Sequence, residues 1–303
     1  MVQPTVGMSG NGRRLRRKIQ ATGWTFAAPG LALLLIVVAV PLVLAIVLAF
    51  SSYTFLHTNV LPFTGLANVK ENVQDPYFWH SLWLTVGYSA VTVTGEVLLG
   101  MGIALLLNQD LRFKGIYYAI LTIPMAMSPV SVALIWHMLL QPNLGIVNHV
   151  LGTLGLPEPD WLGSTTLAFW SVVLVDIWQQ VSFVVLILTA GLSALPTEPY
   201  EAAAIDGASI AQRLYYLTLP LIRPVAAVAV IIQLINEFRA YDLFYVLTKG
   251  GPGIATDVLS YFVYRKAFLG LNINEASAAS FGLLIVVLLL TIAFYALISR
   301  RAH

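Results

Sequence analysis

Six long apolar segments, separated by polar or charged stretches, dominate the pattern of residues along the chain. A helix needs about 20 mainly apolar residues to cross the hydrocarbon core of a bilayer, and each segment reaches that length. The pattern therefore predicts an all-α integral membrane protein with six transmembrane helices, at residues 25–50, 81–107, 116–140, 167–192, 225–247 and 276–298.

The composition supports a membrane protein. Hydrophobic residues make up 58% of the chain, charged residues only 10%, and the mean hydropathy is +0.83. An ordinary soluble domain carries about 25% charged residues. The formal net charge of +2 is too small to indicate nucleic-acid binding. The chain has no cysteine, which excludes disulfides and thiolate ligands, and its five histidines show no metal-ligand spacing, so we expect no metal site.

The distribution of Lys and Arg predicts the orientation, because cytoplasmic loops are enriched in these residues. With six spans, both termini share one side with the loops 108–114 and 194–224. That side holds eleven basic residues: Arg13, Arg14, Arg16, Arg17, Lys18, Arg112, Lys114, Arg213, Arg223, Arg300 and Arg301. The other side holds four: Lys70, Lys249, Arg265 and Lys266. We therefore expect both termini in the cytoplasm and a multi-pass protein of the plasma (inner) membrane.

The predicted organisation is simple. Residues 1–24 form a basic cytoplasmic tail, of which the first 20 are expected to have no fold of their own, and residues 25–303 form one six-helix domain. Pro124 and Pro129 are expected to kink the third span. In the second span, Glu96 lies among glycines that let helices approach, which favours helix pairing over a role in transport.

A polar insert, residues 197–220, separates the fourth and fifth spans on the predicted cytoplasmic side. Thr197 is expected to cap a short helix that carries Pro199 in its first turn, and Gly207 permits a left-handed stop. Ser209 and Gln212 have the spacing of a capping box, which predicts a second short helix ending near the proline at position 220.

The first of these helices carries three successive alanines, Ala202 to Ala204, beside the exposed charge of Glu201. Small side chains allow another surface to approach closely, so this helix fits a groove on a cytoplasmic partner. An amphipathic helix lying on the bilayer is the alternative. It fits poorly, because three alanines bury little apolar area and the face is not basic.

Charged and amide side chains interrupt the fourth and fifth spans. Such residues are costly inside a bilayer unless they face water or a partner, and helical spacing places most of them on one face of each span. Two polar faces predict a shared cavity along a substrate path. Its expected lining residues are Asp176, Gln179, Gln180, Phe183, Gln233, Asn236, Glu237, Arg239 and Tyr241.

Carboxylates, amides and Arg can satisfy sugar hydroxyls, and aromatic rings stack on the apolar faces of sugars. For any single residue, the alternative is an interhelical hydrogen bond or a salt bridge, such as Glu237 with Arg239 or Arg239 with Asp242.

The insert resembles the EAA loop of ATP-binding-cassette importer permeases. That pattern reads E-A-A, three residues, G, nine residues, then I-x-L-P. Here Glu201, Ala202 and Ala203 are followed by Gly207 and by the run LTLP at 217–220, with Leu217 in place of the usual Ile. The similarity extends to six spans and to the TKGGP run at 248–252, which is similar to carbohydrate permeases of the maltose-transporter type.

The resemblance implies a type I importer permease fold and a set of coupling residues that meet an ATPase subunit: Glu201, Ala202, Ala203, Asp206, Gly207, Leu219 and Pro220. It also implies a second homologous permease chain, two ATPase subunits and an extracytoplasmic solute-binding protein. None of the five lysines is followed by Ser or Thr, so the phosphate-binding loop Gly-x4-Gly-Lys-Ser/Thr is absent. ATP and magnesium are therefore expected only on the partners, and this chain is expected to be no enzyme.

The implied function is uptake of a carbohydrate by alternating access. The expected substrate is a sugar, an oligosaccharide, or a related polyol or glycerol phosphate. The substrate-path residues are placed by the same resemblance. Two alternatives remain at this point: an ion-gradient-coupled carrier, which has no need of a docking loop, and, less favoured, a membrane-embedded enzyme.

Overall fold

The computed structural model describes residues 10–53 and 62–299. Over these residues the chain is helical, and strand-like pairing is limited to one bridge between Ser51 and Phe63. The all-α prediction is confirmed. In chain order the helices are α1 Gly10–Ala49, α2 Ala67–Gln74, α3 Pro76–Leu107, α4 Lys114–Ala126, α5 Pro129–Leu139, α6 Ile146–Thr153, α7 Thr165–Ser193, α8 Glu198–Ile205, α9 Ile210–Arg213, η1 Leu214–Thr218, α10 Leu219–Phe238, α11 Asp242–Leu247, α12 Leu259–Tyr264, η2 Arg265–Leu269 and α13 Ile273–Ser299.

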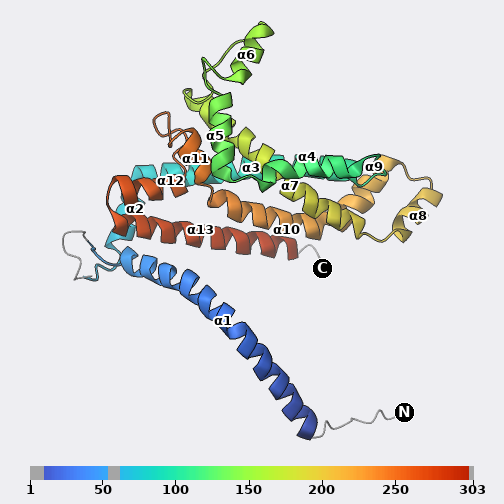
Figure 1. Cartoon of the computed structure of the whole chain (residues 1–303), viewed down its shortest axis with the longest axis horizontal. Helices are drawn as coiled ribbons and strands as arrows, with labels where there is room; N and C mark the ends of the chain where they lie inside the picture. Colours follow the sequence, from blue (N-terminus) through green and yellow to red (C-terminus); the bar gives the residue numbers. More distant parts are fainter. Residues whose placement is uncertain (1–9, 54–61, 300–303) are drawn as a thin grey trace.

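The predicted spans are present. Among the described residues, five helices are long and apolar enough to cross a membrane, and there is a sixth span if the bent pair α4–α5 is counted as one. Helices α3, α4, α7, α10 and α13 run along one another, whereas α1 meets α13 and then slants away from the body (Figure 1). The most apolar window of α1 has no buried residue.

The basic tail differs from the prediction where the structure describes it. Helix α1 begins at Gly10, so residues 10–24 continue the first span as helix instead of lacking a fold. Residues 1–9 lie outside the described part of the chain, as do Arg300, Arg301 and residues 54–61.

The third span is broken, not merely kinked. Helices α4 and α5 meet at an angle of 95°. Ser128, directly before Pro129, is extended as the proline ring favours, and it caps α5 by accepting a hydrogen bond from the Ser131 amide. Pro129 occupies the first turn of α5, where its missing N–H costs nothing. Two prolines and a serine cap therefore end one helix and start another.

The fifth span also departs from its predicted bounds of 225–247. It runs from Ile210 to Phe238, through α9, η1 and α10, and α11 is a separate short helix. The second helix of the insert was thus wrongly expected to end near Pro220. The π-helix η1 precedes that proline, and the Leu219 amide bonds to Leu214 five residues back. In a π-turn an amide bonds to the carbonyl five residues back instead of four. This shift accommodates the proline, which has no N–H, and the helix continues.

Other details of the insert match the prediction. Pro199 lies in the first turn of α8, Gly207 has a φ of 74°, and the capping box of Ser209 and Gln212 is formed in both directions. Thr197 stands at the N-cap of α8, but its side chain makes no capping hydrogen bond. The first turn of α8 instead bonds to the Thr197 carbonyl.

Glycines bring α3 and α7 into close contact. A Cβ atom on Gly100 would lie 2.7 Å from Val184 Cγ1, and one on Gly95 would lie 2.6 Å from Ile177 Cδ1. Gly102, by contrast, faces open space. Gly95 and Gly100 thus permit the close approach expected of small residues in membrane helices, and Gly102 does not contribute to it.

The end of the bundle opposite α8 is held by polar contacts. Lys266 Nζ lies 3.0 Å from Asp75 Oδ2 and 2.5 Å from Glu275 Oε2, and Asn72 donates a hydrogen bond to the Glu275 carbonyl. Burial disfavours the charged form of Lys266, but the hydrogen bonds to Glu275 and Asp75 outweigh it and raise its pKa. These contacts join α2, η2 and α13.

We predict that Gly100→Ala destabilises the protein and that Gly102→Ala does not. The added methyl group at Gly100 collides with Val184, which overpacks a rigid interface at a cost of about 1–3 kcal/mol. At Gly102 the methyl group meets nothing, and alanine favours a helix by up to ~1 kcal/mol. Thermal denaturation of both variants in one detergent checks this, and equal midpoints would contradict the packing argument.

Candidate functional site

A polar cavity of about 330 Å³ lies where α7 and α10 meet the connection to α11. Seven of the nine residues predicted for the substrate path line it: Asp176, Gln179, Gln180, Asn236, Glu237, Arg239 and Tyr241. Pro129 at the start of α5 and Asp242 at the start of α11 also contribute. The two polar helix faces expected from the sequence therefore do share one cavity.

The other two predicted residues do not line this cavity. Gln233 is fully buried one helical turn below Asn236, and Asn236 Nδ2 donates to Gln233 Oε1 at 3.1 Å. Phe183 is half-buried on α7 and is not in the wall of the cavity. Gln233 thus supports a wall residue, and the structure gives Phe183 no place in this pocket.

Asp176 is fixed by a tyrosine that the sequence analysis did not single out. Tyr88 on α3 is fully buried and donates its hydroxyl to Asp176 Oδ2 at 2.6 Å. The ring of Tyr88 packs edge-on against Phe244 of α11. A polar residue in the middle of a glycine- and threonine-rich span was the only sequence signal that pointed to Tyr88.

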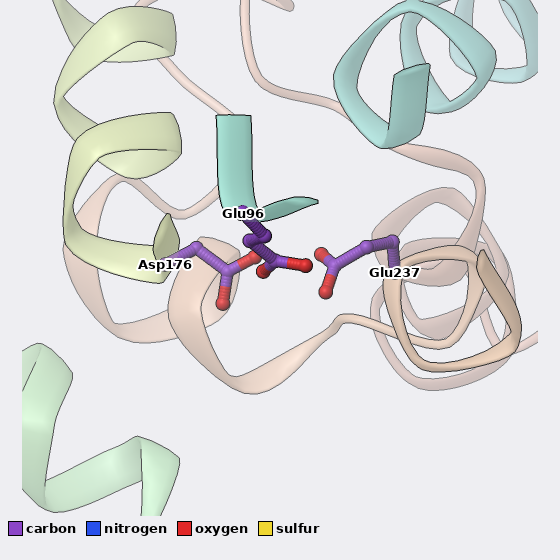
Figure 2. A group of neighbouring side chains, drawn as sticks. All are labelled: Glu96, Asp176 and Glu237. Atoms are coloured by element: carbon purple, nitrogen blue, oxygen red, sulfur yellow. The ribbon is translucent and has the colours of Figure 1, made fainter. Parts of the chain in front are cut away.

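Glu96 of α3 reaches the same place. Its Oε2 accepts a hydrogen bond of 2.8 Å from Gln233 Nε2 of α10, so it does join two helices, as expected of a pairing residue. It also approaches Asp176 and Glu237. One oxygen from each of the three carboxyl groups lies within 4.8 Å of the others, and Figure 2 shows the three side chains pointing toward one another.

This carboxyl cluster, Glu96, Asp176 and Glu237, comes from three helices and is buried, with exposed fractions of 0%, 3% and 2%. Among the described residues, no Lys, Arg or His forms an ion pair with any of the three. Arg239 lies in the same cavity wall but pairs with neither Glu237 nor Asp242, so the neutralising pairs considered from the sequence are not formed.

Aromatic rings surround one side of the cavity. Tyr241 stacks on Tyr245 with ring centres 5.3 Å apart and lies 5.2 Å from Tyr264. Trp178, on the turn of α7 that carries Asp176, packs edge-on against Trp136 of α5 at 5.5 Å. Burial raises the pKa of Tyr241, helped by the neighbouring tyrosines, so its hydroxyl stays protonated and remains a hydrogen-bond donor.

The predicted coupling residues gather at the far end of the same helices. Helix α8 has no buried residue, and Glu201, Ala202, Asp206 and Gly207 are exposed, with Ala203 half-buried. Large apolar side chains stand out beside them: Ile205 is 88% exposed and Ile210 is 78% exposed. Leu219 and Pro220 lie at the start of α10 and are exposed. Ala203, Asp206 and Gly207 border a hollow of about 350 Å³ with Arg213.

Contacts within the insert tie α8 to the long helix. Tyr200 donates its hydroxyl to Thr218 Oγ1 at 3.1 Å, and Thr218 lies in η1. The helical rod that begins at Ile210 ends at Phe238, one residue after Glu237. At about 1.5 Å per residue it spans roughly 40 Å, so the exposed insert and the carboxyl cluster lie at opposite ends of one element.

The chain is similar to several transport proteins. It is 38% identical over 266 residues to the trehalose/maltose transport system permease protein MalF of Thermococcus litoralis, covering 86% of this chain and 89% of that protein. It is 34% identical over 253 residues to the sulfoquinovosyl glycerol transport system permease protein SmoG of Agrobacterium fabrum, covering 83% and 82%. It is also 34% identical over 246 residues to the sn-glycerol-3-phosphate transport system permease protein UgpA of Yersinia pestis, covering 80% and 82%.

The fold has a match among solved structures. A chain of a bacterial ABC transporter involved in the import of the acidic polysaccharide alginate superposes with a TM-score of 0.80 at 24% identity, covering 95% of this chain and 99% of that one. This likeness confirms the importer permease fold. A model of the binding-protein-dependent transport system inner membrane component family matches residues 96–301, which include the carboxyl cluster and the whole insert. The chain therefore belongs to the family of inner membrane components of binding-protein-dependent transport systems.

Proposed function

We propose that this chain is the permease subunit of an ATP-driven importer that takes up a carbohydrate by alternating access. One observation carries the proposal: a polar cavity between membrane helices is joined by the unbroken rod Ile210–Phe238 to an exposed docking loop. Force applied at the loop therefore acts on the cavity wall without passing through a flexible connection.

The partners follow from the loop and from the family. Two ATPase subunits would dock on the α8 helices of this chain and of a second, homologous permease chain, with ATP and magnesium bound only to the ATPases. A solute-binding protein would deliver substrate on the opposite, extracytoplasmic side, with both termini of this chain in the cytoplasm and the complex in the plasma (inner) membrane. One solved relative in fold is a complex with an alginate pentasaccharide-bound periplasmic protein, which supports such delivery.

The cavity chemistry supports a carbohydrate. Amides and carboxylates offer hydrogen bonds in several directions, and Tyr241 adds an aromatic face and a hydroxyl donor. The substrates in the relatives' names are trehalose and maltose, sulfoquinovosyl glycerol and sn-glycerol-3-phosphate. We infer a sugar, an oligosaccharide, a polyol or a glycerol phosphate, held by Asp176, Gln179, Gln180, Asn236, Glu237, Arg239 and Tyr241.

We predict that Glu201→Lys abolishes association with the ATPase. The substitution reverses an exposed charge at the centre of the docking surface without removing a buried contact. Glu158→Lys, on the exposed connection between α6 and α7, makes the same reversal elsewhere and should keep the ATPase. Pull-down of each tagged chain from its native membrane, followed by an ATP hydrolysis assay, measures this.

A wild-type chain that purifies without an ATPase would contradict the proposal. Uptake that stops when the ion gradient is collapsed, with ATP maintained, would indicate a gradient-coupled carrier instead.

We also predict that Gln180→Leu raises the KM for uptake about fivefold. Gln180 lines the cavity and its side chain makes no hydrogen bond with another described residue, so its side-chain amide is available to substrate. The loss of one hydrogen bond costs ~1 kcal/mol, which corresponds to about a fivefold change. Gln109→Leu, in the exposed connection between α3 and α4, is the matched control.

Uptake of radiolabelled trehalose, maltose and glycerol 3-phosphate identifies a transported substrate, and that substrate is then used for both variants. An unchanged KM in Gln180→Leu would remove this residue from the binding site.

A further inference from the structure

The carboxyl cluster brings three acidic groups together without a basic partner among the described residues. Three acidic side chains from α3, α7 and α10 meet inside the bundle, and each is at least 97% buried. Within the described part of the chain, their hydrogen-bond donors are Tyr88 and Gln233, and both are uncharged. Burying a carboxylate is costly unless a positive charge or strong hydrogen bonds compensate. The protein itself supplies no counter-charge within ion-pair distance in the part of the chain that the structure describes.

Two carboxylate oxygens of the cluster remain free to bind a ligand. Glu96 Oε1 and Glu237 Oε2 are buried and accept no hydrogen bond from a described residue. A neutral ligand atom is free as well: Gln179 donates its amide to the Met127 carbonyl, while its own Oε1 is buried without a partner. Gln179 lines the cavity together with Asp176 and Glu237, so this unpartnered amide oxygen belongs to a residue of the same wall.

The spacing of the oxygens fits a hard cation. The cluster oxygens lie within 4.8 Å of one another. Ligand atoms around one calcium ion lie at most about 4.6–5.2 Å apart, because calcium–oxygen distances are about 2.3–2.6 Å, so separations within this limit are compatible with calcium. Magnesium, at about 2.0–2.1 Å, needs a smaller and nearly octahedral site and gives up its water reluctantly. Carboxylate and amide oxygens are the ligands that calcium prefers, and three carboxylates suit a divalent ion better than a monovalent one.

We propose that Glu96, Asp176 and Glu237 form a calcium site in the wall of the cavity, with the Gln179 oxygen completing it. Asp176 and Glu237 belong both to this site and to the cavity lining, so the ion lies beside the bound substrate. The ion offsets the negative charge of the wall and brings α3, α7 and α10 together at the end of the long rod. Ion binding does not depend on the identity of the substrate.

Equilibrium dialysis with radioactive calcium tests the proposal on the full-length chain, purified in lipid nanodiscs with whatever subunits accompany it. The wild type should bind calcium saturably, and an equal concentration of magnesium should not displace it. Glu96→Gln keeps the hydrogen-bonding shape but removes one ligand charge, which should weaken binding at least about tenfold. Asp110→Asn removes a charge from the exposed connection between α3 and α4 and should bind calcium as the wild type does.

Thermal denaturation of the wild type gives a second readout, which does not require that a variant folds. Calcium should raise the midpoint of the wild type, because a ligand that binds only the folded state stabilises it. If Glu96→Gln fails to fold, Glu237→Gln takes its place in the dialysis, since it removes the same charge from a different helix.

Absence of saturable binding to the wild type would overturn the proposal, as would binding that Glu96→Gln and Glu237→Gln leave unchanged. A chain that binds no calcium but prefers an aminated sugar to its neutral analogue would also refute it, because the carboxylates would then serve a cationic substrate. The calcium-binding outcomes depend neither on ATPase association nor on sugar uptake, so the importer proposal stands or fails separately.

Discussion

The unbroken helix from Ile210 to Phe238 is the element on which the arrangement of the other parts depends. Two prolines lie within it, at 220 and 224, and either could end a helix in water. The π-turn of η1 accommodates the first, and packing of Ile222 and Ala229 against Leu188 and Ala104 holds the segment in the bundle. Because the helix continues, an exposed surface at one end and a buried carboxylate at the other move as parts of one body.

A second constraint is the glycine contact between α3 and α7. It brings the two backbones close enough for Tyr88 and Glu96 to reach the polar face of α7, and Tyr88 bonds directly to Asp176. A bulkier residue at Gly95 or Gly100 would separate the helices and the carboxyl groups with them. The chemistry of the cavity therefore rests on small residues that have no functional group of their own.

Much of the fold and part of the site could be predicted from the sequence. Apolar segments of sufficient length give the spans, and the spacing of Asp176, Gln179, Asn236 and Glu237 places them on facing helices. Sequence periodicity does not tell a proline that kinks a helix from one that ends it, so the break before Pro129 and the continuity through Pro220 were missed. The contact of Glu96 with Asp176 and Glu237 was missed for another reason. It depends on the packing of three helices, and a local sequence pattern describes only one helix at a time.

Helix α7 hydrogen-bonds to carbonyl groups of the broken third span. Gln179 donates to the Met127 carbonyl at 3.1 Å, and Ser182 donates to the Leu121 carbonyl. In a bilayer such bonds are hard to replace, so the elbow between α4 and α5 follows α7 when α7 tilts. Helices α5 and α6 project from this elbow, away from the long helices (Figure 1). Because Val132 and Ala133 of α5 pack with Leu243 and Phe244 of α11, the elbow also connects α7 to the α11 side of the cavity.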